Sequence, residues 1–153
     1  MNIEKIASTF QLVGSRILKV SIDNSFFEIT NSIPAKKTID VNYEILSISR
    51  EEESIYGVMK LYIKSKISTK SKDENEVGPR KYKFDLVIEG CFTDTLEIDD
   101  KKFESYLRIN GSAALYSIAR GFILGTSAQT LLSGQVMLPM ANFVQMEELK
   151  KDE

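Results

Sequence analysis

The amino-acid sequence predicts an α+β domain, in which a four-stranded antiparallel meander sheet is followed by a long bent helix, an extended crossing loop and a short C-terminal helix. Residues 10–92 carry apolar side chains at every second position over long stretches, which is the period of a half-buried strand. Residues 101–131 change to the spacing of an amphipathic helix. A chain of 153 residues is long enough to bury one core, so we expect a single domain over 1–153.

The first two strands differ in the regularity of their alternation. The first begins at Phe10 and ends before the turn residues 23–25, and its apolar side chains share one parity: Phe10, Leu12, Leu18, Val20 and Ile22. The second covers about Thr38–Arg50 and has an apolar face formed by Ile39, Val41, Tyr43 and Ile45. Leu46 and Ile48 then take the opposite parity, which indicates a β-bulge or burial on both faces.

The third and fourth strands alternate more regularly. The third, Ile55–Ile67, has one apolar face: Ile55, Met59, Leu61, Ile63 and Ile67. The fourth, Lys81–Phe92, places Tyr82, Phe84, Leu86 and Ile88 opposite charged residues. Between them, the polar run 69–80 has nothing to bury and predicts a mobile hairpin tip.

The helical part begins where Asp99 or Asp100 can cap a helix that starts at Lys101. Asn110-Gly111 predicts a bend, and the longer segment runs over Ser112–Leu131. One stripe along this segment consists of small residues: Ser117, Gly121 and Gly125. Glycine inside a helix costs about 1 kcal/mol relative to alanine, so the stripe needs a packing reason. Close packing on the protein's own sheet and a helix–helix contact between subunits both supply one.

Ser133-Gly134 ends the long helix and is followed by an extended apolar segment, 136–143, and a short helix near Met146–Leu149. In an extended chain, alternate side chains point in opposite directions. Val136 and Leu138 would therefore face one way and Met137 the other, so that one set holds the segment on the domain and the other lines a groove.

Composition restricts the chemistry. The chain has no histidine, so the commonest general base and metal ligand are absent, and we expect neither an enzyme nor a cofactor. A net charge of −2 does not indicate a binding surface for nucleic acid or anionic lipid.

The N-terminal residues do not resemble a signal peptide, and the apolar stretch 113–124 is too short for a membrane span and contains Arg120. We therefore expect a cytoplasmic protein without membrane insertion.

Three other features have structural interpretations. The acidic residues Asp94, Glu97, Asp99 and Asp100 lack the spacing of a calcium loop and are better explained by helix capping. Cys91 is interpreted as a small core residue rather than a nucleophile. Arg120, alone on an apolar helix, is expected to pair with a carboxylate or with carbonyl oxygens.

The last third of the chain carries a family resemblance. Leu115-Tyr116-Ser117-Ile118-Ala119-Arg120 resembles the Leu-Phe-Pro-Tyr-Ala-Arg motif at the start of the long helix in the SecB family of export chaperones. About twenty residues later, Val136-x-Leu138-Pro139-Met140-Ala141-Asn142-Phe143 is similar to the family's Leu-x-Leu-x-Pro-Val-Asn-Phe crossing. Ser117 and Met140 stand where the family has proline, and Ser133-Gly134 replaces an aromatic–proline pair, so the resemblance is to a divergent member.

The resemblance implies an ATP-independent holding chaperone for unfolded or partner polypeptides, with an eight-stranded sheet per dimer and a dimer or tetramer as the assembly. It also implies that the crossing segment forms one wall of a client groove, for which the candidates are Val136, Met137, Leu138, Met140 and Phe143. It assigns Val136 and Leu138 to the groove, so Leu138→Glu is expected to weaken client capture while the fold survives. Docking to a translocase motor would use acidic residues on the outer sheet face, where Asp23 and Asp85 are the nearest candidates beside Lys81 and Lys83.

Two other function classes remain open from the sequence. One is a dedicated binding protein that guards a single partner, such as an antitoxin. The other is a carrier that holds a small hydrophobic ligand between the sheet and the helix. The sequence does not decide between these and a general chaperone.

Overall fold

The computed structural model describes residues 8–25, 35–69 and 80–151. The predicted polar hairpin tip falls almost wholly outside these residues. The elements are β1 (Gln11–Asn24), β2 (Ala35–Glu51), β3 (Ser54–Thr69), β4 (Lys81–Thr95), α1 (Asp100–Tyr106), the π-helical turn η2 (Leu107–Gly111), α2 (Ser112–Thr130) and α3 (Phe143–Lys151). The predicted α+β architecture, with four antiparallel strands before the helices, is confirmed.

The strand order is β1-β4-β3-β2, and every neighbouring pair is antiparallel. Strands β2, β3 and β4 form the predicted meander, but β1 lies next to β4 instead of β2. The sheet is therefore a Greek-key arrangement rather than a simple four-strand meander. The segment 25–34 between β1 and β2 is longer than ordinary hairpin loops, so adjacency in sequence did not require adjacency in the sheet.

Both edge strands contain bulges. The register of β2 against β3 shifts between Ile45 and Ser47, which confirms the bulge predicted from the change of parity at Leu46. The register of β1 against β4 shifts twice, between Leu12 and Gly14 and between Ile17 and Lys19. Because of these shifts, Leu12, Ile17 and Val20 pair with inner-face residues of β4 although their parity differs. Leu18, predicted on the same face as Leu12, lies instead at the second bulge.

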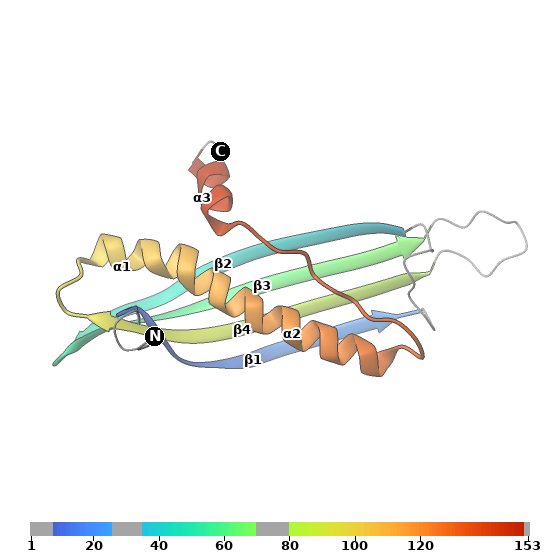
Figure 1. Cartoon of the computed structure of the whole chain (residues 1–153), viewed down its shortest axis with the longest axis horizontal. Coiled ribbons are helices and arrows are strands. Elements are labelled where there is room, and N and C mark those ends of the chain that lie inside the picture. The colour runs from blue at the N-terminus through green and yellow to red at the C-terminus, as the bar shows by residue number, and fades with distance from the viewer. Residues whose placement is uncertain (1–7, 26–34, 70–79, 152–153) are drawn as a thin grey trace, which may run out of the picture.

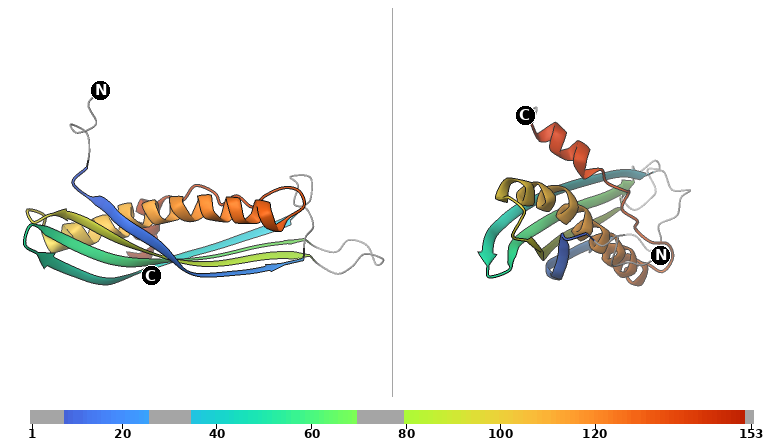
Figure 2. Two further views of the ribbon diagram at one scale, coloured as in Figure 1. Left: turned by 90° about the horizontal axis from the view of Figure 1, so that it is seen from below. Right: turned by 60° about the vertical axis from the view of Figure 1, so that its left-hand side comes forward.

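The helices cover one face of the sheet, with α1 and α2 running obliquely along the strands (Figures 1 and 2). The buried residues of β3 and β4 alternate strictly and point toward these helices. Their opposite face, here called the outer face, is not covered by another element within the described residues. The core thus lies between the inner face of the sheet and the α1–η2–α2 helix.

Two glycines in the sheet let the helix approach closely. A Cβ added at Gly57 would lie 2.5 Å from Leu107 Cδ1, and one added at Gly90 would lie 2.6 Å from Leu115 Cδ2. Phe10, just before the start of β1, closes the same core, and its ring stacks on Phe92 with centroids 5.3 Å apart. The helix, the sheet and the N-terminal side of β1 therefore form one continuous packing unit.

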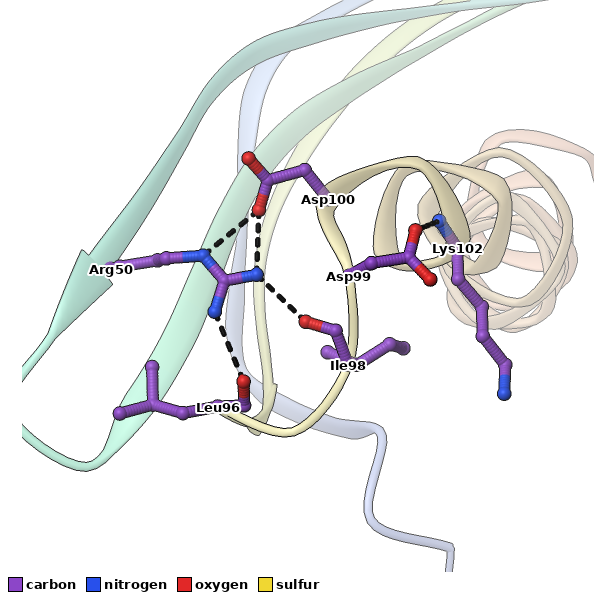
Figure 3. Close-up of polar contacts among 6 residues, drawn as sticks. All are labelled: Arg50, Leu96, Ile98, Asp99, Asp100 and Lys102. Carbon is purple, nitrogen blue, oxygen red and sulfur yellow. Dashed lines mark hydrogen bonds and ion pairs between the residues drawn. The ribbon is translucent and has the colours of Figure 1, made fainter.

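Arg50 fixes the connection between β4 and α1 (Figure 3). Its guanidinium donates from Nε and Nη2 to Asp100 Oδ1, at 2.9 and 2.7 Å, and also to the carbonyl oxygens of Leu96 and Ile98. Asp99 caps α1 by accepting a hydrogen bond from the Lys102 backbone N–H at 2.9 Å. The capping interpretation is confirmed for Asp99, and Asp100 lies in the first turn of α1, whereas Asp94 lies within β4 and does not cap the helix.

The chain reverses direction after α2 at Gly134, whose φ of 85° lies in the left-handed region that glycine adopts without strain. Residues 132–142, here called the crossing strip, then pass back over the domain to α3, which lies beyond β2 (Figure 1). The predicted short helix begins earlier than expected, at Phe143. Asn142 accounts for this because its Oδ1 accepts the Gln145 backbone N–H.

Candidate functional site

The crossing strip is attached to α2 by three side chains that contact its backbone. Ser127 Oγ accepts a hydrogen bond from the Val136 N–H at 2.7 Å. Arg120 Nε donates to the Leu138 carbonyl oxygen at 3.0 Å, and the Tyr116 hydroxyl donates to the Pro139 carbonyl oxygen at 3.0 Å. These anchors lie on successive parts of one side of α2, so the strip runs alongside that helix.

Side chains along the strip alternate between buried and exposed. Val136 and Leu138 are 3% and 1% exposed and belong to the core. Met137 and Met140 are 59% and 79% exposed. Phe143 is buried and its ring contacts that of Tyr116 edge-on, at 5.6 Å between centroids.

This arrangement reverses the expected roles of the two sets. Of the five residues proposed for the client groove, Val136, Leu138 and Phe143 are core residues in this subunit, because they face α2 and the sheet. Met137 and Met140 face solvent. A binding surface on this strip therefore has to be built from the methionines and from exposed apolar neighbours such as Leu132, which is 86% exposed.

Arg120 has the carbonyl partner expected from its isolation on an apolar helix. Besides the Leu138 carbonyl, its Nη1 donates to Met140 Sδ at 2.8 Å. The side chain is half-buried between α2 and the strip. Arg120 thus contacts both the buried residue Leu138, through its carbonyl oxygen, and the exposed side chain of Met140.

Helix α3 is attached by polar contacts as well as by its buried residue Phe143. The Tyr43 hydroxyl on β2 donates to Glu147 Oε1 at 2.6 Å, and burial together with that carboxylate raises the pKa of Tyr43 above its ordinary value. Tyr43 therefore remains a protonated donor. Lys150 Nζ lies 4.0 Å from the centre of the Tyr43 ring and donates to Asn42 Oδ1 at 3.2 Å.

A shallow hollow of about 350 Å³ lies where α3 meets β2. Its lining combines apolar groups with amides and one amine: Val41, Asn142, Gln145, Met146, Leu149 and Lys150. Val144 and Leu149 on α3 are also exposed apolar residues. The crossing strip and α3 together present apolar side chains on one continuous segment of the chain.

The small-residue stripe of α2 faces away from the core. Ser117, Gly121 and Gly125 are exposed, and a Cβ added at either glycine would meet no atom within 4 Å. Packing on the protein's own sheet therefore does not explain them. The other exposed residues of α2, which include Ile118, Ala128 and Gln129, are uncharged, so the exposed face of a 19-residue helix carries no ionised group.

The two candidate docking carboxylates lie on the outer face and already have partners. Asp23 pairs with Lys81 at 2.7 Å, and Asp85 pairs with Lys83 at 3.2 Å. Register places opposite charges side by side elsewhere on this face, as in the row Glu44, Lys60, Glu89 and Arg16 across the four strands. The outer face is thus a mixed-charge surface rather than an acidic one.

Cys91 lies on the outer face and is half-buried, so its interpretation as a core residue is wrong. The reason is parity: the core residues of β4 have even numbers, and Cys91 follows the opposite set. Burial, with a smaller effect of Glu51, raises the pKa of the Cys91 thiol. The thiol is therefore less ionised at neutral pH than an ordinary cysteine.

Sequence reasoning missed several residues of the site. Ser127 is fully buried and interrupts the apolar face of α2, and that interruption is a recognisable sign of a polar anchor. Asn142 and Gln145 have the spacing of a helix capping pair, which could have predicted the start of α3. Nothing in the local pattern distinguished Leu132, Val144 and Leu149 from core residues.

Within the parts of the chain that the structure describes, no helix has both the length and the apolar character needed to cross a bilayer. The same residues contain no group of three or more histidine, cysteine, aspartate or glutamate side chains placed to hold a metal ion.

Comparison with known proteins is informative at the level of structure. No protein-family model matches the chain, and no curated protein sequence matches it. Among solved structures, the chain is similar to a SecB-like chaperone from Mycobacterium tuberculosis, determined in complex with a ChAD peptide from an antitoxin. The TM-score is 0.52 at 14% identity, over 87% of this chain and 91% of that one. The chain therefore has a divergent SecB-like fold.

Proposed function

We propose that this SecB-like domain is an ATP-independent, non-catalytic holder of polypeptides, which captures unfolded or extended segments on the crossing strip and α3. The observation that carries the proposal is the alternation in the strip, where Met137 and Met140 are exposed while their neighbours Val136 and Leu138 are fixed in the core. Methionine is flexible and polarisable, so it adapts to side chains of different shape. The similar Mycobacterium chaperone, solved with a bound peptide, supports this proposal.

The binding surface is built to accept an extended segment. The strip's backbone is fixed by three hydrogen-bonding side chains of α2, so client capture need not order the strip itself. The hollow beside α3 offers room for a side chain at the end of the strip. Lys150 at its rim favours a client whose apolar segment is next to an acidic residue or a carbonyl oxygen.

A direct test replaces the exposed methionines with a charged residue. The double variant Met137→Glu/Met140→Glu is expected to bind a permanently unfolded client, carboxymethylated lactalbumin, at least about tenfold more weakly, because two apolar contacts are lost. The fold should persist because both positions face solvent. Affinity is measured by fluorescence anisotropy of the labelled client.

The matched control is Ser133→Glu/Gln135→Glu, which adds the same charge at two exposed polar positions of the same strip. It should bind within about twofold of the wild type if apolar contact, rather than charge, determines affinity. Equal binding by the methionine variant and the wild type would exclude the strip as the client surface.

Affinity arguments favour an oligomer. A groove that buries about 400 Å² of apolar client surface yields on the order of 10 kcal/mol, at roughly 25 cal/mol per Å². Ordering and association of a disordered client cost about 4–15 kcal/mol, so one groove binds weakly. Several grooves on one body raise the effective concentration of later segments, which increases avidity by about 100-fold or more. We therefore propose a dimer or tetramer, with the uncharged stripe of Ser117, Gly121 and Gly125 as a contact between subunits.

Enlarging the stripe should separate the subunits. Gly121→Leu has no neighbour to displace within 4 Å inside the subunit, so the domain should fold normally and the helix should not be weakened. A leucine side chain would nevertheless prevent a second helix from approaching closely, and light scattering should report a smaller species. Ser105→Leu adds the same side chain at an exposed position of α1 and should leave the assembly unchanged. An unaltered mass for Gly121→Leu would remove the stripe from the interface.

A dedicated partner is the second candidate function. It is favoured by the single antitoxin peptide bound to the similar Mycobacterium chaperone. A pull-down that returns one stoichiometric partner would support this narrower function, whereas many substoichiometric clients would support general holding. A small-ligand carrier has less support, because buried side chains fill the space between the sheet and α2.

A cytoplasmic location is part of the same proposal, as is contact with a translocase motor. For the latter, the ion pairs of Asp23 and Asp85 with lysines mean that a basic partner would have to compete with Lys81 and Lys83.

A further inference from the structure

The four methionines in the described part of the chain fall into two classes. Met59 is fully buried under the helix, and Met146 is half-buried on α3. Met137 and Met140 are largely exposed. Both lie in the crossing strip, a few residues after the end of α2. The two accessible thioethers thus lie on the surface to which clients are proposed to bind.

We propose that Met137 and Met140 form an oxidation site, at which hydrogen peroxide converts the thioethers to sulfoxides and weakens capture of apolar polypeptide. The inference about capture rests on the proposed function, whereas the location of the oxidation site does not. A sulfur lone pair attacks one peroxide oxygen, the O–O bond breaks, an S–O bond forms and water leaves. Sulfur loses two electrons and the peroxide gains them. A thiol-dependent methionine sulfoxide reductase returns them, with release of water and formation of a disulfide in the reductase.

Arg120 gives the oxidised form of Met140 a partner. Its Nη1 already donates to Met140 Sδ at 2.8 Å, while its Nε holds the Leu138 carbonyl oxygen. A thioether is a weak acceptor, whereas a sulfoxide oxygen is a strong one, so the bond to the charged guanidinium strengthens on oxidation. Arg120 would therefore hold the oxidised side chain toward α2 and make the exposed surface more polar, without releasing the strip.

The cysteine is a second oxidisable group in the described part of the chain. Cys91 lies on the outer face, away from the strip, and its thiol is half-buried. The thiolate is the form that reacts with peroxide, and burial disfavours that form at neutral pH. A Cys91→Ser background removes this group from the experiment altogether.

The experiment treats the full chain with hydrogen peroxide, removes the oxidant with catalase and maps added oxygen by peptide mass spectrometry. Met137 and Met140 are expected to be modified before Met59 and Met146. The affinity for carboxymethylated lactalbumin should then fall about tenfold, and a sulfoxide reductase with dithiothreitol should restore it. A Met137→Leu/Met140→Leu variant, which keeps apolar side chains at both positions, should bind client equally before and after treatment.

Equal oxidation of the buried Met59 would overturn the site assignment. Unchanged client affinity after complete modification of Met137 and Met140 would overturn the link to capture. Untreated protein that captures no client would contradict the proposed function and with it that link, while the mass map would still decide the site by itself.

Discussion

Leu138→Glu is expected to destabilise the domain by about 4 kcal/mol or more, because it places a carboxylate in the apolar core. Leu138 is 1% exposed and its carbonyl oxygen is held by Arg120, so the strip cannot turn the new side chain outward without losing that anchor. The sequence had suggested that this substitution would affect client capture alone. Urea denaturation followed by circular dichroism measures the change in the free energy of unfolding.

Met137→Glu is the matched comparison for Leu138→Glu, one residue away in the same strip. Its side chain already faces solvent, so its free energy of unfolding should lie within about 0.5 kcal/mol of the wild type. Similar destabilisation by the two variants would show that the alternation of buried and exposed positions is wrong. The comparison is informative because both variants add the same group.

Gly57→Ala is expected to destabilise the domain by about 2 kcal/mol, since overpacking of a close-packed core costs roughly 1–3 kcal/mol. The added Cβ would lie 2.5 Å from Leu107 Cδ1 and 2.9 Å from Phe103 Cε1. Both neighbours are fully buried, which limits their ability to move away. Thermal denaturation should show a lowered Tm without loss of secondary structure at low temperature.

Gly14→Ala provides the control for an added methyl group in a strand. Nothing lies within 4 Å of the Cβ position at Gly14, and the residue has no positive φ. Its Tm should therefore equal or slightly exceed that of the wild type, because alanine reduces the entropy of the unfolded chain. A Tm for Gly57→Ala that matches this control would mean that the helix does not approach the sheet as closely as described.

The sequence predicts the strands better than their order. Strict alternation in β3 and β4 correctly identifies both faces, because each strand packs one face against the helix and leaves the other open. The position of β1 beside β4 depends on long-range pairing, which a local period does not contain. The second bulge of β1, near Leu18, is similarly determined by pairing with β4.

For the site, period and resemblance identify the segment but not the orientation of its side chains. Alternation predicts that Val136 and Leu138 face opposite to Met137, yet the choice of the inward set depends on where α2 lies. The same limit applies to the stripe that contains Gly121 and Gly125. Their spacing shows that the two residues share a face of the helix, but it does not show whether that face contacts the sheet or solvent. Only the surroundings of each glycine separate the two explanations.

The crossing strip is anchored through its main chain, so its attachment to the domain and the character of its exposed side chains are independent. Tyr116 and Ser127 bind main-chain atoms of the strip, so the side chains at positions 137 and 140 take no part in those bonds. If the strip captures polypeptides as proposed, residue changes at these two positions would alter which polypeptides are preferred while the scaffold stays constant. A library randomised there would sample recognition directly, and the same independence would let related domains acquire new partners through few substitutions.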